Sequence, residues 1–132
     1  MRKILFRGKF GNEWKYGFLS IEPKGLVIKE PYKNESSNVW HIDADTVGQY
    51  TGLTDKNGTK IFEGDIVKYG DTVHNVVFEQ RNGTAYFGLV YSTLETLSFG
   101  YYQDLKQIEV IGNIYDNPEL LGDENNEKRD NS

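Results

Sequence analysis

Apolar and polar residues alternate in short runs along most of the chain, and this period of two is typical of half-buried β-strands. Near the N-terminus, the runs KILFRGKF and KYGFLSI flank Gly11 and Asn12, which predicts a β-hairpin. The run GLVIKE predicts a further strand that ends before Pro31, because proline has no N–H to donate to a ladder. VWHID predicts the next strand, and DADT predicts a turn, since short Asp side chains bond to nearby backbone groups.

Two Asn-Gly pairs, Asn57-Gly58 and Asn82-Gly83, are the strongest turn signals, because a type I′ hairpin turn needs positive φ at both central residues. The second pair joins HNVVFEQ to TAYFGLVY, two alternating runs in which Val76 and Phe78 share one face. GDIVKYG precedes them and QIEVIGNIY follows them as further strands. Four strands spaced by such turns predict a small barrel or roll.

The C-terminal third gives weaker signals. Over residues 93–107 some apolar residues have helical spacing but Gly100 interrupts it, so we expect a helical turn within a loop. DNPELLG predicts one short helical turn, with Asn117 as N-cap, Pro118 at the first position and Gly122 as terminator. The last residues, DENNEKRDNS, contain no apolar side chain and predict a disordered acidic tail.

The predicted fold class is mainly β. At 132 residues the chain is long enough for one compact unit or for two small lobes sharing a core. An aromatic content of 14% favours pleated, half-buried surfaces. We expect an N-terminal hairpin or meander lobe over residues 1–45, a barrel or roll over 46–121 with one short C-terminal helical turn, and a tail over 122–132.

Composition excludes several kinds of chemistry. The chain has no cysteine, so it has no disulfide, thiolate nucleophile or cysteine-bound metal. The net charge of -5 argues against a general polyanion binder, although a local basic patch stays compatible with it. No apolar run reaches the length of a signal peptide or a membrane span, which predicts a soluble cytoplasmic protein.

Three blocks of the sequence resemble the YopX family of phage and prophage proteins. They are FRGKFGNEWKYG at 6–17, TVGQYTGLTDKNGTKIFEGDIVKY at 46–69 and EVIGNIYDNPELL at 109–121. Asp45 stands where many relatives have Glu, and 20–40 and 92–107 match no family pattern. The resemblance implies a β-rich protein whose later part is an SH3-type barrel, encoded by phages or prophages of mainly Gram-positive bacteria and present in the host cytoplasm. It implies no activity and no catalytic residues.

Two stretches with acidic residues suggest metal-site hypotheses. Glu63 and Asp65, with Glu79 and Arg81 on the neighbouring strand, have the residue types of a metal-dependent nuclease. The alternative is that Glu63-Gly64-Asp65 turns the chain, with Asp65 bonding local N–H groups, and we favour it because the spacing is not diagnostic. TDKNG has a passing likeness to calcium loops, but it lacks their third alternating ligand and final glutamate.

The two histidines, His41 and His74, lie outside any metal-ligand spacing, so strand positions on the surface or within hydrogen bonds are the favoured interpretation. A general base stays an alternative, although no serine or threonine is tied to either by a motif. We therefore expect no metal, no cofactor and no enzymatic activity.

Binding functions remain. The leading hypothesis is a protein that acts through contacts with itself, forming a homo-oligomer, or with a host or phage protein, because aromatic side chains are enriched at interfaces. The candidate partner contacts are Gln49, Tyr50 and Thr51, a polar-aromatic run between two glycines. The runner-up is nucleic-acid binding in the N-terminal lobe, where basic and aromatic residues alternate. Its candidate contacts are Arg7, Lys9, Trp14 and Lys15.

Overall fold

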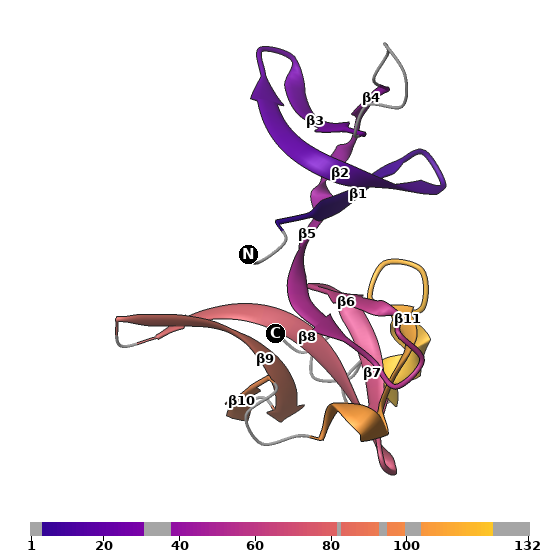
Figure 1. The fold of residues 1–132 in the computed structure, drawn as a ribbon, viewed down its shortest axis with the longest axis vertical. Coiled ribbons are helices and arrows are strands. Elements are labelled where there is room, and N and C mark those ends of the chain that lie inside the picture. Colours follow the sequence, from indigo (N-terminus) through magenta and orange to yellow (C-terminus); the bar gives the residue numbers. More distant parts are fainter. Residues whose placement is uncertain (1–3, 31–37, 82, 93–94, 100–103, 123–132) are drawn as a thin grey trace. The chain divides into compact units, whose positions relative to one another are not determined.

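The computed structural model describes residues 4–30, 38–81, 83–92, 95–99 and 104–122 (Figure 1). The strands form two antiparallel sheets, so the prediction of a mainly β fold is confirmed. The chain divides into two compact units between Gly52 and Leu53. This division falls inside a strand that runs from Asp43 to Thr54.

The first unit contains a sheet whose strands follow the spatial order β4-β3-β2-β1-β5. Their bounds are β1 Phe6–Phe10, β2 Glu13–Glu22, β3 Gly25–Lys29, β4 Val39–His41 and β5 Asp43–Thr54. The hairpin predicted around Gly11 is confirmed, since Phe10 pairs with Glu13 and Gly11 has a φ of 62°. The first four strands form a meander, as expected of this region.

This sheet curls upon itself. Only Ile42 lies between β4 and β5, yet these strands stand at opposite ends of the unit's own sheet order. The strongly bent course of β2 is visible in Figure 1. Ile42 packs so closely over Gly8 that a Cβ atom at position 8 would collide with it. The glycine therefore makes room for the side chain that fills the inside of the curl.

The turn predicted at Asp43–Thr46 is wrong, because these residues begin β5. The expected local bonds nevertheless form: Asp45 donates its N–H to Asp43 Oδ1 (3.0 Å), and the Thr46 hydroxyl donates to the Asp43 carbonyl (2.6 Å). A bulge between Arg7 and Lys9 interrupts the β1–β5 ladder at this place. The Lys9 N–H instead donates to Thr46 Oγ1 at 2.9 Å, so side-chain bonding and strand geometry coexist.

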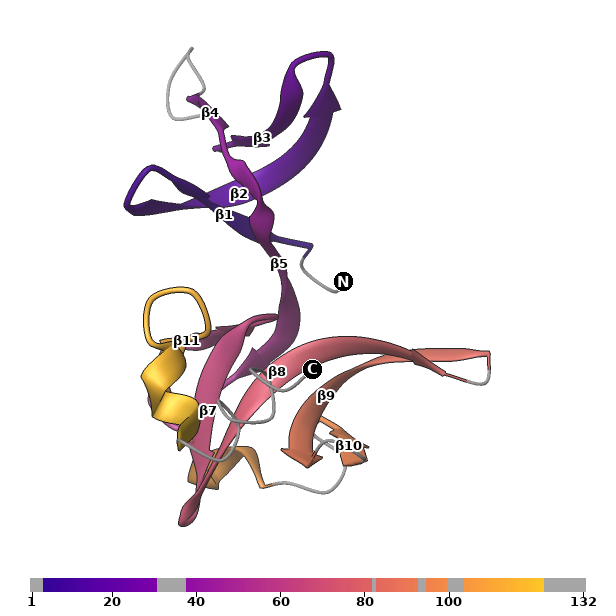
Figure 2. The same cartoon turned by 180° about the vertical axis from the view of Figure 1, so that it is seen from behind.

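The second unit contains β6, which hydrogen-bonds to β5, and a five-stranded sheet of order β10-β9-β8-β7-β11. The bounds are β6 Lys60–Phe62, β7 Asp65–Tyr69, β8 Thr72–Arg81, β9 Thr84–Ser92, β10 Glu95–Ser98 and β11 Ile108–Asn113. Its sheet is not a closed barrel, since β10 and β11 remain its two ends. Figures 1 and 2 both show the long β8–β9 hairpin reaching beyond its neighbours.

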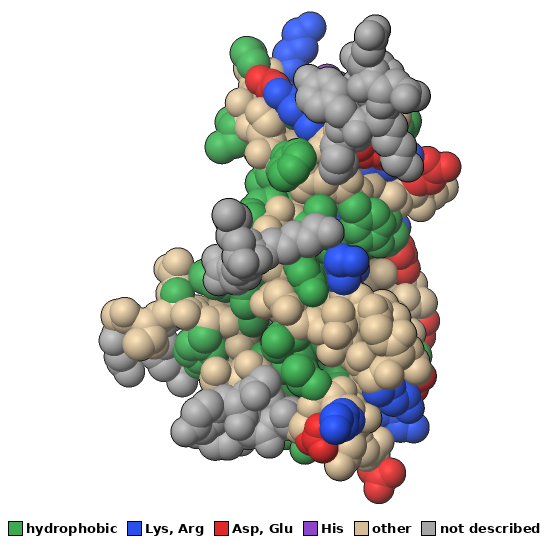
Figure 3. All heavy atoms as spheres, in the orientation of Figure 1, with side chains coloured by type: hydrophobic (Ala, Val, Ile, Leu, Met, Phe, Trp, Pro, Cys, Tyr) green, Lys and Arg blue, Asp and Glu red, His purple; other side chains and the backbone are tan. Residues whose placement is uncertain are grey.

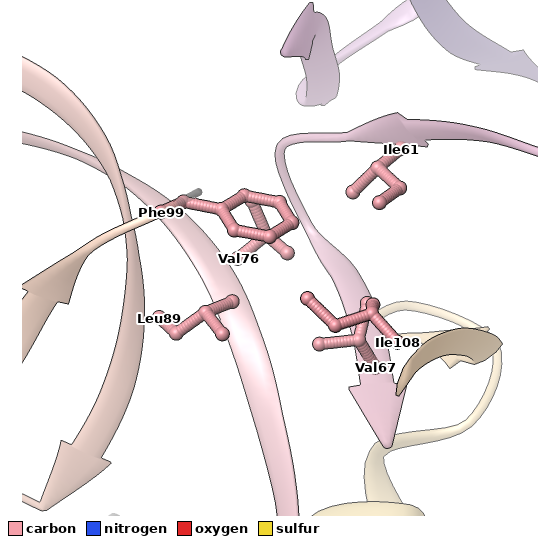
Figure 4. Packing of buried hydrophobic residues seen from close by; sticks show 6 residues of the cluster. All are labelled: Ile61, Val67, Val76, Leu89, Phe99 and Ile108. Atoms are coloured by element: carbon pink, nitrogen blue, oxygen red, sulfur yellow. The ribbon is translucent and has the colours of Figure 1, made fainter. Parts of the chain in front are cut away.

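The core of the second unit is built from one buried cluster (Figure 4). Five of its members come from five different strands, and the sixth is the residue that directly follows β10. They are Ile61, Val67, Val76, Leu89, Phe99 and Ile108. Val76 and Leu89 face each other across the β8–β9 ladder, and the hairpin predicted around the second Asn-Gly pair is confirmed. Gly83 has the expected positive φ of 80°, whereas Asn82 lies outside the described residues.

The weaker C-terminal signals have mixed outcomes. Within 93–107 the structure has a strand, β10, and a 3-10 helix, η1 Leu105–Gln107, and the prediction of a helical turn within a loop misses the strand. Leu97 pairs with Leu89 of β9, so sheet pairing prevails over the helical spacing. The predicted terminal turn is confirmed as η2, Pro118–Leu121, followed by Gly122 with a φ of 84°. Residues 93–94, 100–103 and 123–132 lie outside the described residues.

Candidate functional site

The register of the first unit places three aromatic side chains of β2 on one face, because residues two apart on a strand point the same way. They are Trp14, Tyr16 and Phe18. Tyr16 is 44% exposed and Phe18 56% exposed, whereas Trp14 is half-buried. Lys29 of β3 is the cross-strand neighbour of Phe18. Val39 of β4, which is 48% exposed, is in turn the cross-strand neighbour of Lys29. We call this side of the sheet the outer face.

Two cations of β1 lie over Trp14 on the same face. Arg7 Cζ is 4.6 Å and Lys9 Nζ 5.4 Å from the centroid of the Trp14 ring. Arg7 is only 5% exposed. A buried guanidinium stacked on an indole supports the ring by a cation–π interaction and presents little charge to solvent.

The fourth residue of the predicted nucleic-acid set, Lys15, points to the opposite, inner face. Its Nζ lies 3.9 Å from the centroid of the Trp40 ring and 3.2 Å from Glu13 Oε2. Trp40 also contacts Phe10, with ring centroids 5.0 Å apart. The structure therefore brings Arg7, Lys9 and Trp14 together and separates Lys15 from them, and nucleic-acid contact stays a prediction.

The candidate partner residues Gln49, Tyr50 and Thr51 lie within β5. Tyr50 is 8% exposed, and its N–H donates to the carbonyl of Leu5 at 2.8 Å. Gln49 pairs with Phe6 of β1, and both Gln49 and Thr51 are half-buried. Their role as partner contacts stays a prediction. It now concerns residues of a strand, and the ring of Tyr50 is buried.

An open cavity of about 350 Å³ adjoins the outer face at β4, lined by Glu22, Pro23, Lys24, Val27, Val39 and His41. Val27 is buried, at 1% exposure. Glu22 Oε1 forms an ion pair with Lys29 Nζ, at a distance of 3.1 Å. This hydrogen bond and the charge of Lys29 hold the pKa of Glu22 below its usual range. Sequence reasoning missed this cavity, which brings together residues from three strands.

Asp65 has the structural role that we favoured over a nuclease. It is 2% exposed, and its Oδ2 accepts the N–H of Phe62 at 2.7 Å, which confirms the predicted turn. Gly64 has a φ of 93° within this turn. Among the described residues, no group of three or more His, Asp or Glu side chains is placed to hold a metal ion.

His74 is a buried strand residue held by hydrogen bonds, one of the alternatives expected for it. Its Nδ1 lies 2.9 Å from the carbonyl of Val90, and its Nε2 lies 2.7 Å from Thr72 Oγ1. Because a carbonyl can only accept, Nδ1 carries the proton of this bond. His41 is exposed on the rim of the cavity.

Asp55 organises the turn around Asn57-Gly58. Its Oδ1 accepts the N–H groups of Asn57 (2.8 Å) and Thr59 (2.9 Å), and its Oδ2 accepts that of Val110 (2.9 Å). Burial tends to raise the pKa of Asp55, but these three hydrogen bonds and the charge of Lys56 outweigh burial and lower it. The turn extends from Asp55 to Thr59 and is longer than the two-residue turn expected.

Comparison with known proteins identifies the family of the chain and gives no activity. Within the described residues, no helix is both long and apolar enough to cross a membrane. Comparison with curated proteins found no match. Among solved structures, the chain is similar to the crystal structure of protein EF1440 from Enterococcus faecalis. The two are 24% identical, with a TM-score of 0.48, over 92% of this chain and 100% of that chain. The family model described as YopX protein matches residues 7–122, and the chain therefore belongs to the YopX family.

Proposed function

We propose that this protein is a phage- or prophage-encoded binding protein that acts without catalysis, through protein–protein contacts in the cytoplasm of the bacterial host. The observation that carries the proposal is the outer face of the first unit, where Tyr16, Phe18 and Val39 are each about half exposed. The phage or prophage origin rests on the family resemblance given above.

The outer face has the chemistry of a protein-binding surface. Aromatic side chains bury a large area at low cost in side-chain entropy, and they are enriched at the centres of protein interfaces. Arg7 and Lys9 of β1 lie over the ring of Trp14 and support it. Trp14 is the neighbour of Tyr16 on the same face of β2. The exposed rings therefore stand on a supported surface and need little ordering when a partner binds.

Capture from lysate of a bacterial host tests the proposal. The double variant Tyr16→Ser, Phe18→Ser is compared with Ile21→Ser, which removes an 83% exposed side chain of the same strand on the other face. We expect the double variant to lose a protein that the natural chain and Ile21→Ser both retain. Light scattering of the purified chain shows whether that partner is a second copy. Retention of the same proteins by all three chains would refute the proposal.

Nucleic-acid binding at the same face is the second candidate function. The observation in its favour is that Lys9 and Lys29 flank the exposed rings of Tyr16 and Phe18, as cations do around base-stacking aromatics. It ranks second because Lys9 lies over Trp14 and Lys29 is paired with Glu22. Electrophoretic mobility shifts at low salt, with single-stranded and duplex probes, test this function directly.

A further inference from the structure

The outer edge of β4 carries backbone groups that the described strands leave unpaired. β4 is the end strand of its sheet. The N–H of Ile42 donates to Leu26 (3.1 Å) and that of Glu30 to the carbonyl of Asn38 (3.0 Å). Hydrogen-bonded pairs alternate along an antiparallel ladder, so Trp40 is the next such residue on β4. The N–H and C=O groups of Val39 and His41 are therefore directed away from β3.

The second unit treats one of its own sheet edges differently. β11 is also an end strand, but the turn at Asp55 covers it. The N–H of Lys56 donates to the carbonyl of Ile108 at 3.0 Å, and the N–H of Val110 donates to Asp55 Oδ2 at 2.9 Å. A covered edge cannot recruit another strand. Of these two end strands, β4 is the one whose outer edge stays open to pairing with the described strands and turns accounted for.

The cavity lies beside this edge, on the outer face. A strand added antiparallel to β4 would place two side chains, those opposite Val39 and His41, on the outer face and two residues apart. The cavity has an apolar floor of Val27 and an apolar side at Val39. Lys24 lies in the β2–β3 turn, toward the His41 end of β4, and no ion pair involving it is found among the described residues.

We infer that β4 binds an extended segment of a partner protein as an added strand. The segment carries an apolar side chain, placed opposite Val39 and entering the cavity, and an acidic side chain two residues along, facing Lys24. This mode of recognition takes affinity from main-chain hydrogen bonds and specificity from pockets for alternate side chains. The inference rests on the proposed function, since it names the class of protein that the first unit binds.

The same features argue against two other occupants. The outward N–H and C=O groups of Val39 and His41 match the spacing of a polypeptide backbone, which nucleic acid lacks. Antiparallel pairing of β4 with β4 of a second copy would place Val39 opposite His41 and supply no acidic side chain to Lys24. A segment with an apolar residue and an acidic residue two positions apart would pair with the edge of β4, fill the cavity and face the charge of Lys24.

The test begins with selection of phage-displayed random peptides, about twelve residues long, on the purified full-length chain. We expect the enriched peptides to share an apolar residue and an acidic residue two positions apart. Amide chemical shifts of ¹⁵N-labelled protein with the best synthetic peptide should change at β4 and around the cavity. Peptides without this spacing, or shifts confined to other strands, would overturn the inference.

Variants test the main-chain hydrogen bonds of β4 and the charge of Lys24 separately. Val39→Pro removes an N–H that the β3–β4 ladder does not use, as edge strands tolerate, and should weaken the peptide at least about tenfold. Val39→Thr retains the N–H and the branched shape and should weaken it less. Lys24→Glu should reverse the preference, so that a peptide with lysine at the acidic position binds better. Val39→Pro binding equal to that of the natural chain, or Lys24→Glu with an unchanged preference, would count against the inference.

The outcomes also distinguish this inference from the proposed function. If Tyr16→Ser, Phe18→Ser abolishes partner capture while Val39→Pro and Lys24→Glu leave it unchanged, the edge site is refuted and the proposed function stands. If all of these variants capture the same partner as the natural chain, both are refuted. If Val39→Pro does not fold, Lys24→Glu alone decides.

Discussion

The two units use their apolar residues in opposite ways. Among the described residues, the second unit holds nine of the twelve buried hydrophobic side chains, whereas the first holds Val27, Ile28 and Tyr50. Of the eight large hydrophobic side chains that are exposed among the described residues, six belong to the first unit, and Figure 3 shows hydrophobic side chains on the surface of this unit. Large exposed apolar surface is typical of interaction sites, so this contrast supports the proposal that the second unit provides stability and the first unit provides recognition.

Polar residues follow the same division. In the second unit, the carboxylates of Asp55 and Asp65 are buried and accept backbone N–H groups that the sheets leave over. In the first unit, the cations of Arg7, Lys9 and Lys15 lie over indole rings. Buried carboxylates fix the backbone of turns, whereas stacked cations support side chains whose other edges face solvent.

The largest effect is expected from Ile108→Ala. Ile108 has no exposed surface and belongs to the core cluster, so the loss of its side chain should lower the free energy of unfolding by roughly 2–5 kcal/mol. Ile21→Ala, which changes an 83% exposed residue of β2, should cost less than about 1 kcal/mol. Urea unfolding measures both. Similar losses for the two variants would break the comparison between the units.

A smaller effect, of roughly 1–3 kcal/mol at neutral pH, is expected from Asp55→Asn, because an amide cannot accept three N–H groups as the carboxylate does. The pKa of Asp55 is lower in the folded than in the unfolded chain, so its stabilisation is complete above about pH 4 and is lost as the pH falls through the folded value. Urea unfolding at several pH values should show the two chains converging in acid.

Asp71→Asn is the matched control, since Asp71 is exposed in the turn between β7 and β8. It should leave the free energy of unfolding within about 0.5 kcal/mol of the natural value at neutral pH. If the natural chain and Asp55→Asn still differed in their free energy of unfolding below the folded-state pKa of Asp55, the carboxylate charge would not be what stabilises the turn.

Apart from the controls, the smallest loss is expected from Trp14→Leu, which removes the ring beneath Arg7 and Lys9 and should cost roughly 1–2 kcal/mol. Amide hydrogen exchange should rise in β1 and β2 and stay unchanged in β7, β8 and β9, because the stacking is local to the first unit. An equal rise in both units would show that they open together, and would weaken the assignment of separate roles.

Most strands and turns were predictable from sequence, since alternation and Asn-Gly or Gly-Asp signals are properties of adjacent residues. The strand that begins at Asp43 was not, because its polar residues bond locally in either conformation. β10 was not predictable either: its pairing with β9 depends on Leu89, which the local pattern of Leu97 does not reveal.

The candidate site was predictable only in part. Basic and aromatic residues cluster at 7–15 in the sequence, but neighbours on a strand point to opposite faces, so Trp14 and Lys15 cannot serve one surface. The cavity at β4 depends on the register that brings Val27 beside His41, and on the curl of the sheet. Residue spacing contains neither piece of information.

The curl of the first sheet also has a consequence for the order of folding. Strands β1 to β4 are joined by neighbouring-strand hairpins and can form from local segments as the chain leaves the ribosome. β1 must then wait for β5, since Phe6 pairs with Gln49 at the far end of the first unit. Contacts of such long sequence separation form slowly, because loop closure must precede them. In the nascent first unit, the hairpins therefore form before the sheet curls. Pairing of β5 with β1 is expected to limit the rate of folding of this unit.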